Sequence, residues 1–191
     1  MCGISGFIDY SKKTDREMLL NMNRTMTHRG PDGEGYSIFN EDKATVGLGH
    51  RRLSIIDLSE GGAQPKTFQQ LHITFNGEIY NYAEIKAELE AKGHQFNSHS
   101  DTEVILHAYQ AWGSAALQKF IGMFAFAIYD ETNQKLFACR DRAGTKPFFY
   151  YWKNGLFLFA SELKAIVGHA AFVKEINIDA VAAFMQYGYV P

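Results

Sequence analysis

The sequence of 191 residues contains only two cysteines, Cys2 and Cys139, and only four prolines. Two cysteines cannot build the disulfide framework of a small secreted domain, and their scarcity favours a reducing compartment, so we expect a cytoplasmic location. No apolar run approaches the roughly 20 residues that span a membrane. No basic segment followed by a hydrophobic one opens the chain, so no secretory signal is predicted.

An excess of charge of either sign is also lacking. The 19 Lys and Arg residues nearly balance the 21 Asp and Glu residues, and the formal net charge is −2. This balance argues against nucleic acid or an anionic membrane as the main partner. The seven histidines show no zinc-ligand spacing, and no glycine-rich phosphate loop occurs, so no metal site and no nucleotide cofactor are predicted in this chain.

The first six residues, Met-Cys-Gly-Ile-Ser-Gly, are the most informative stretch. An initiator methionine is commonly removed before a small residue, and removal would leave Cys2 with a thiol and a free α-amine. The amine titrates near pH ~8 and the thiol near ~8.5, so the amine can accept the thiol proton at little cost. The pattern predicts a self-contained nucleophile and base, although a cysteine that merely follows Met1 is the alternative at this point.

The length of 191 residues predicts one domain, and the order of the expected elements predicts the α+β class with stacked sheets and outer helices. A capping box, Thr14-x-x-Glu17, is expected to open the first helix. Further helices are expected after Asn81 and Ser100, and near the end of the chain at 161–167 and 179–187. Strands are expected at 6–10, 34–39, 44–48 and 71–75. Four more, at 123–129, 135–140, 148–152 and 156–160, are predicted to form an antiparallel meander.

Three places in the sequence allow both a structural and a functional interpretation. Arg51 and Arg52 are adjacent on a predicted strand, so one can face a cleft while the other faces solvent or pairs with an acid. Asn76 and Gly77 follow a strand, where they could make a tight turn or supply two donors to an oxyanion. Asp101 opens a helix, where it could complement the helix dipole or bind a substrate ammonium.

Eight blocks of the sequence, taken in order, resemble one known family. They are MCGISG, HRGPDGEGY, GHRRLSIID, GAQP, FNGEIYN, SDTEVILHAY, GMFAFAIYD and RDRAGTKPFFY. Together they resemble the glutaminase domain of glutamine-dependent asparagine synthetases, a class II glutamine amidotransferase of the N-terminal nucleophile hydrolase superfamily. The resemblance implies a single glutaminase domain over residues 1–191, folded as a four-layer αββα sandwich of two antiparallel sheets. It also implies that the tail from about residue 176 starts the connection to a C-terminal synthetase domain.

The resemblance further implies a role for each candidate site residue. Cys2 is the expected nucleophile, with its own α-amine as the general base. The resemblance assigns the oxyanion hole to Asn76 and Gly77, the substrate α-carboxylate to Arg52, a backbone contact to Ile55, and the substrate α-ammonium to Glu78 and Asp101. These residue types suit a free α-amino acid, because a guanidinium fork matches the carboxylate and acidic side chains match the ammonium.

The implied reaction converts L-glutamine to glutamate and ammonia through a γ-glutamyl thioester on Cys2. The implied partner is the synthetase domain, and ATP and Mg²⁺ are expected only there, because its Ser-Gly-Gly-x-Asp-Ser loop does not occur in this chain. A homodimer is compatible with the resemblance. The sequence leaves open whether the ammonia acceptor is aspartate or a carboxylate on another metabolite.

Two other functions remain as alternatives. The first is an N-terminal cysteine hydrolase that acts on another amide, such as a conjugated bile salt or a penicillin. Arg52, Glu78 and Asp101 argue against it, because those amides lack a free α-amino acid end. The second is a non-catalytic module that senses glutamine and in which Cys2 is vestigial.

Overall fold

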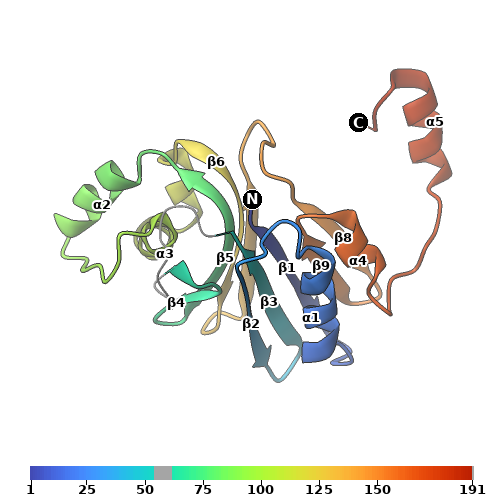
Figure 1. Ribbon diagram of the computed structural model, residues 1–191, viewed down its shortest axis with the longest axis horizontal. Coiled ribbons are helices and arrows are strands. Elements are labelled where there is room, and N and C mark those ends of the chain that lie inside the picture. Colours follow the sequence, from blue (N-terminus) through green and yellow to red (C-terminus); the bar gives the residue numbers. More distant parts are fainter. Residues whose placement is uncertain (54–61, 191) are drawn as a thin grey trace.

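The computed structural model describes residues 1–53 and 62–190 and has four layers (Figure 1). Two antiparallel sheets stack face to face in the middle, and helices cover the outer face of each sheet. This arrangement confirms the predicted αββα sandwich. One end of the sandwich holds the start of the chain, and the candidate site lies there.

The first sheet has five strands in the order β2-β3-β1-β9-β8. Its central strand, β1, runs antiparallel to β3 with Gly3 opposite Arg51, so the start of the chain lies beside the end of β3. Two helices, α1 and α4, pack on this sheet. The elements are β1 (Gly3–Asp9), α1 (Arg16–Thr25), β2 (Gly33–Asn40), β3 (Thr45–Arg52), β8 (Phe149–Lys153), β9 (Leu156–Ala160) and α4 (Leu163–Val167).

The second sheet has four strands in the order β4-β5-β6-β7, with α3 packed on β4 and β5 and α2 packed on α3. The predicted four-strand meander is therefore wrong as a single unit, because β6 and β7 join this sheet while β8 and β9 join the first. The elements are β4 (Lys66–Phe68), β5 (Leu71–Ile79), α2 (Tyr82–Glu90), α3 (Asp101–Trp112), the 3₁₀ helix η2 (Gly113–Gln118), β6 (Gly122–Asp130) and β7 (Lys135–Arg140).

Strand β6 shows why the two sheets stack. Its residues alternate between two apolar layers: Phe124, Phe126 and Ile128 pack towards the helices, whereas Ala125 and Ala127 face the first sheet. Because both faces are buried, the strand is apolar at nearly every position rather than at every second one. The small alanines leave room for the large side chains that the first sheet contributes to the interface.

Helix α1 begins later than the sequence predicted. Asp15, not Thr14, is the N-cap residue, and its side chain accepts a hydrogen bond of 2.9 Å from the N–H of Met18. The hydroxyl of Thr14 donates instead to the carboxylate of Asp9, at 2.8 Å. The buried carboxylate of Asp9, the last residue of β1, needs hydrogen-bond donors. The Thr14 hydroxyl therefore bonds to Asp9 and does not cap the helix.

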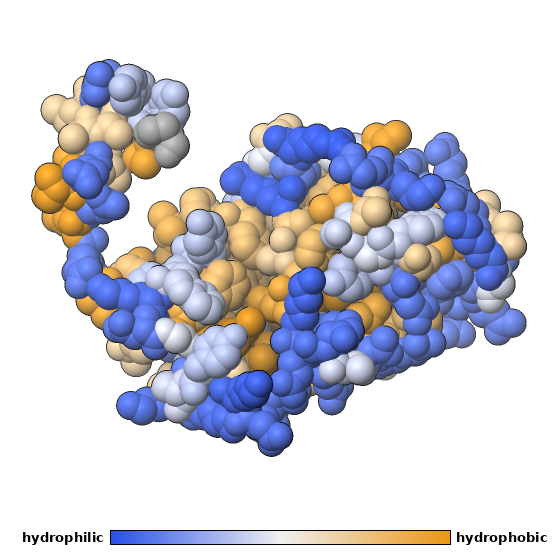
Figure 2. All heavy atoms as spheres, turned by 180° about the vertical axis from the view of Figure 1, so that it is seen from behind, coloured by the Kyte–Doolittle hydropathy of each residue, from blue (hydrophilic) through white to orange (hydrophobic). Residues whose placement is uncertain are grey.

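The last helix, α5 (Ile178–Tyr187), stands away from the sandwich on an extended segment (Figures 1 and 2). None of its residues is buried, although several are large and apolar, among them Ile178, Phe184 and Met185. Figure 2 shows this helix as a separate lobe with a partly apolar surface. No helix in the described part of the chain is long and apolar enough to cross a membrane.

Candidate active site

Cys2 immediately precedes β1 and contacts Leu53, the residue that immediately follows β3. The N–H of Leu53 donates to Cys2 Sγ at 3.4 Å, and the thiol lies 3.7 Å from the carbonyl oxygen of Leu53. The Nε of Arg29 donates to the carbonyl oxygen of Cys2 at 3.0 Å. Cys2 is half-buried. The thiol is therefore fixed in position and still accessible.

Arg29 contacts Cys2, although its sequence pattern did not predict it as a site residue. One guanidinium nitrogen, Nη1, lies 3.3 Å from Glu162, while Nη2 is buried and has no partner among the described residues. A buried donor without a partner is costly in a folded protein. The block HRGPDG that follows α1 could have pointed to Arg29, but its Gly and Pro indicated only the end of a helix.

Two hydrogen bonds bring β5 to the same end of the sandwich. The hydroxyl of Thr74 donates to the carbonyl oxygen of Gly49 at 2.9 Å. The ring Nε2 of His50 lies 3.2 Å from the carbonyl oxygen of Phe75. Successive residues of β5 therefore contact successive residues of β3. The next residue of β5, Asn76, lies near the end of β3, which is beside the start of the chain.

Asn76 and Gly77 continue β5 as a strand, so the tight turn that their sequence allowed is absent. Asn76 is buried, and its Nδ2 has no partner among the described residues. Gly77 stands opposite Phe124, whose N–H and carbonyl bond to Asp141 on the far side of β6. Because the sides used for bonding alternate along antiparallel strands, the N–H of Gly77 faces the open edge of β5.

The donors on either side of Gly77 along that edge are both used. The N–H of Phe75 donates to Gln64 Oε1 at 2.7 Å, and the N–H of Ile79 donates to Asp101 Oδ2 at 3.1 Å. The N–H of Gly77 makes no hydrogen bond to any residue that the structure describes. It and the Nδ2 of Asn76 are therefore two neighbouring donors without a partner among the described residues, as an oxyanion hole would need.

Close packing explains why position 77 is glycine. A Cβ at Gly77 would stand 2.3 Å from the carbonyl oxygen of Met123 on the neighbouring strand. Any larger residue would push β5 away from β6. The N–H of Gly77 would move with it.

Arg51 and Arg52 project to different surroundings, as strand alternation predicts. Arg51 is buried; its Nε donates to Gly30 O at 3.0 Å and its Nη1 lies 3.6 Å from Glu34. Arg52 is half-buried. A Cβ at Gly62 would stand 2.4 Å from Arg52 Nη2, so the guanidinium lies directly against the chain that resumes at residue 62.

Glu78 and Asp101 form a pair of interacting carboxylates. Burial raises the pKa of Asp101 to about 6, and the charge of Glu78 adds to the rise. Burial also raises the pKa of Glu78, while the positive charge of Lys146 opposes that rise. Two carboxylates in a partly desolvated place favour a bound cation, because a cation relieves their repulsion. Ile55 lies outside the described residues.

Lys146 connects the carboxylate pair to the start of the chain. Its Nζ lies 3.4 Å from the sulfur of Met1, and its charge acts on Glu78. The structure therefore brings the predicted nucleophile, the two predicted oxyanion donors and the two carboxylates to one end of the sandwich. Met1 is present, so the nitrogen of Cys2 is an amide in this form of the chain.

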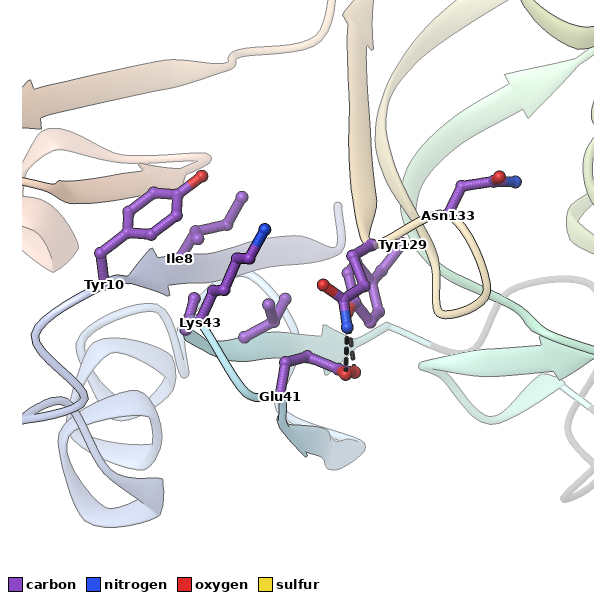
Figure 3. A pocket seen from close by; sticks show the side chains of 9 residues that line it. Ile8, Tyr10, Glu41, Lys43, Tyr129 and Asn133 are labelled. Atoms are coloured by element: carbon purple, nitrogen blue, oxygen red, sulfur yellow. Dashed lines mark hydrogen bonds between the residues drawn. The ribbon is translucent and has the colours of Figure 1, made fainter.

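Two hollows on the surface do not have Cys2 in their lining. One, of about 240 Å³, lies near the opposite end of β1, where the hydroxyl of Tyr129 donates to Glu41 at 2.8 Å (Figure 3). The other, of about 390 Å³, lies beside η2 and the segment that follows β7. Neither is lined by a predicted site residue.

Residues 1–191 match a protein family described as a glutamine amidotransferase domain. The chain belongs to this family. It is 42% identical to asparagine synthetase [glutamine-hydrolyzing] 1 of Bacillus subtilis over 100% of this chain and 30% of that protein. It is also 42% identical to asparagine synthetase B [glutamine-hydrolyzing] of Escherichia coli over 92% of this chain and 31% of that protein.

Solved structures support the same fold. Glutamine phosphoribosylpyrophosphate amidotransferase from Bacillus subtilis superposes with a TM-score of 0.72, at 22% identity, over 87% of this chain and 43% of that one. The predicted N-terminal nucleophile hydrolase fold is thereby confirmed. This amidotransferase domain spans about a third of the length of the two asparagine synthetases that it resembles.

Proposed function

We propose that this domain hydrolyses the side-chain amide of L-glutamine, with Cys2 as the nucleophile once Met1 has been removed. The observation that carries the proposal is the presence of two unused donors, Asn76 Nδ2 and the Gly77 N–H, at the end of the sandwich that holds the start of the chain. A donor pair of this kind stabilises the tetrahedral intermediate of acyl transfer.

The reaction follows from the position of these groups. The free α-amine of Cys2 takes the thiol proton, and Sγ attacks the amide carbon of glutamine. The carbonyl oxygen becomes an oxyanion that accepts from Asn76 and Gly77, each donor being worth roughly 3–4 kcal/mol in the transition state. The amine returns its proton to the departing nitrogen, so ammonia leaves and a γ-glutamyl thioester remains. Water, deprotonated by the same amine, then releases glutamate.

Recognition of a free amino acid rests on three charged side chains. We assign the α-carboxylate of glutamine to the guanidinium of Arg52, and a backbone contact to Ile55. The α-ammonium is assigned to Glu78 and Asp101, whose mutual repulsion a cation would relieve. Amides without a free α-amino acid end would bring no cation to relieve the repulsion between Glu78 and Asp101, which disfavours the bile-salt or penicillin alternative.

The wider protein is proposed to be an asparagine-synthetase-type enzyme. In this proposal the ammonia passes to a synthetase domain that binds ATP and Mg²⁺ and transfers nitrogen to aspartate or another carboxylate. The names of the relatives and the exposed apolar surface of α5 support it. The two free cysteines are consistent with a reducing cytoplasm.

A trapping experiment tests the proposal. Protein with Cys2 at its N-terminus is mixed with glutamine, and the reaction is quenched in acid. The intact mass of the protein is then measured by mass spectrometry, and glutamate and ammonia are assayed in parallel. We expect a γ-glutamyl adduct on Cys2 and steady production of glutamate. The matched variant Cys2→Ala should show neither. Turnover by Cys2→Ala would overturn the mechanism, and binding of glutamine without turnover by the unmodified domain would favour a sensing module.

A further inference from the structure

The loop between β7 and β8 carries the block RDRAGTKP, to which the proposed reaction assigns no role. This loop is held from both sides. The carboxylate of Asp141 accepts from the backbone N–H groups of Phe124, Thr145 and Lys146 at 3.1, 2.9 and 3.0 Å. The Nε of Arg140 donates to the carbonyl oxygen of Lys146 at 2.6 Å. The backbone of Lys146 is therefore fixed.

The side chain of Lys146 is buried, with 6% of the residue exposed, although it forms no ion pair with any described residue. A buried ammonium without a bonded carboxylate costs stability. Its Nζ lies 3.4 Å from the sulfur of Met1, the residue whose removal creates the catalytic amine. A few covalent bonds separate that sulfur from the nitrogen of Cys2, so Nζ lies within roughly 10 Å of that nitrogen.

Other charges lie at the same end of the sandwich. From the second sheet and α3 come the carboxylates Glu78 and Asp101, which would favour a protonated amine; the charge of Lys146 acts on Glu78, and that of Glu78 acts on Asp101. From the first sheet comes the cation Arg52, which follows Arg51, the residue opposite Gly3 in β3. Arg29 also touches Cys2, but its charge is offset by Glu162. The ammonium of Lys146 opposes the two carboxylates most directly, because it acts on Glu78 and touches Met1.

We propose that Lys146 is a positioning residue whose positive charge disfavours protonation of the α-amine of processed Cys2. This inference rests on the proposed function, because it concerns the base of that reaction. Like charges repel, so a fixed ammonium nearby disfavours a second positive charge on the amine. At the separations that the geometry allows, the expected effect on the pH profile is about 0.5–1.5 pH units.

The test compares kcat/KM for glutamine against pH in Met1-processed wild type, Lys146→Met and Lys146→Arg. Activity on the acidic side requires the unprotonated amine, so Lys146→Met should move the acidic limb to higher pH by about 0.5–1.5 units. Lys146→Arg keeps the charge and should leave the limb near its wild-type position. Lys135→Met, which removes an exposed lysine from β7, is the matched control and should not move it.

A second readout separates this inference from the proposed function. The rate at which an N-hydroxysuccinimide ester acylates the N-terminus of processed Cys2, measured against pH by peptide mass spectrometry, reports the unprotonated amine without any need for turnover. Lys146→Met should shift this labelling profile upward as well. Unshifted profiles in Lys146→Met, or a loss of rate that is equal at every pH, would overturn the inference. If Lys146→Met fails to fold, Lys146→Gln serves in its place. Absence of turnover in wild type beside a shifted labelling profile would overturn only the proposed function.

Discussion

The ring Nε2 of His50 lies 3.2 Å from the carbonyl oxygen of Phe75, and this hydrogen bond joins the two sheets one residue before Asn76. Because a carbonyl can only accept, the ring carries its proton on Nε2. Burial is the main cause that lowers the pKa of His50 to about 4; the bond to Phe75 opposes this fall, and the charges of Arg52 and Arg51 contribute to it. The bond therefore holds β5 beside β3 with a neutral histidine.

This pKa predicts a specific loss of stability in acid. A histidine whose folded pKa lies near 4 and whose unfolded pKa lies near 6.5 stabilises the fold fully above pH 6.5, and this contribution is lost as the pH falls from 6.5 towards 4. We expect it to reach about 3 kcal/mol. Urea unfolding at pH 7 and pH 4.5 measures the drop. His50→Gln can still donate but does not titrate, so its drop should be smaller; an exposed control, His99→Gln, should behave as wild type.

A second prediction concerns the removal of Met1. Met1 is 56% exposed, so an aminopeptidase can reach it, and Cys2 is a small second residue. Protein that retains Met1 lacks the free amine and should hydrolyse glutamine at least ~100-fold more slowly, which is the usual cost of losing a general base. Treatment of that protein with methionine aminopeptidase should restore the rate, with intact mass as the check. Equal rates before and after treatment would rule out the amine as the base.

The sequence predicted most elements of the fold because their apolar patterns are strong. It failed where long-range contacts outweigh local signals. The local sequence of Asn76 and Gly77 is also compatible with a tight turn, but pairing with β6 keeps both residues in a strand. The hairpins β6–β7 and β8–β9 look alike in sequence, and only packing assigns them to different sheets.

The candidate site shows the same limit. The resemblance supplied Cys2 together with its oxyanion donors and substrate ligands, but it assigned no role to Arg29 or Lys146. Arg29 matters because it contacts Cys2, which lies 27 positions away in the sequence. Lys146 contacts Met1 across 145 positions. Neither contact has a local sequence signature, because both depend on how distant segments of the chain pack together.

The two cysteines should respond differently to substitution. Cys2→Ala should abolish glutamine hydrolysis, because it removes the nucleophile. The melting temperature should stay within a few degrees of wild type, because the thiol is only half-buried and belongs to none of the apolar core clusters of the described residues. Cys139 packs against the apolar core of the second sheet, and burial, followed by the charge of Asp141, raises its pKa to about 12. Cys139→Ala should keep the activity and cost about 1 kcal/mol of stability. Loss of activity in both variants would refute the assignment of Cys2.

Asp101 predicts how glutamine binding depends on pH. The substrate ammonium needs an ionised carboxylate, and burial, reinforced by Glu78, sets the pKa of Asp101 at about 6. The affinity of a Cys2→Ala protein for glutamine should therefore fall as the pH drops through about 6, by up to about tenfold per unit below it. Calorimetric titration between pH 5 and pH 8 measures this. Cys2→Ala with Asp101→Asn should bind weakly and show a flatter profile; an unchanged slope would place the ammonium elsewhere.

Arg52 gives the sharpest test of the substrate class. If its guanidinium grips the α-carboxylate, Arg52→Lys should mainly raise KM, because lysine keeps the charge and loses the bidentate fork. Loss of a partly desolvated charge pair costs about 2–5 kcal/mol, so Arg52→Ala should cut kcat/KM by roughly 30-fold or more. Arg51 is buried against Gly30 and Glu34, so Arg51→Ala should lower the melting temperature and change KM little. Steady-state kinetics beside a thermal melt separates the two arginines. A larger KM effect in Arg51→Ala would show that Arg51 is the substrate ligand, and no effect on KM in either would mean that free glutamine is not the substrate.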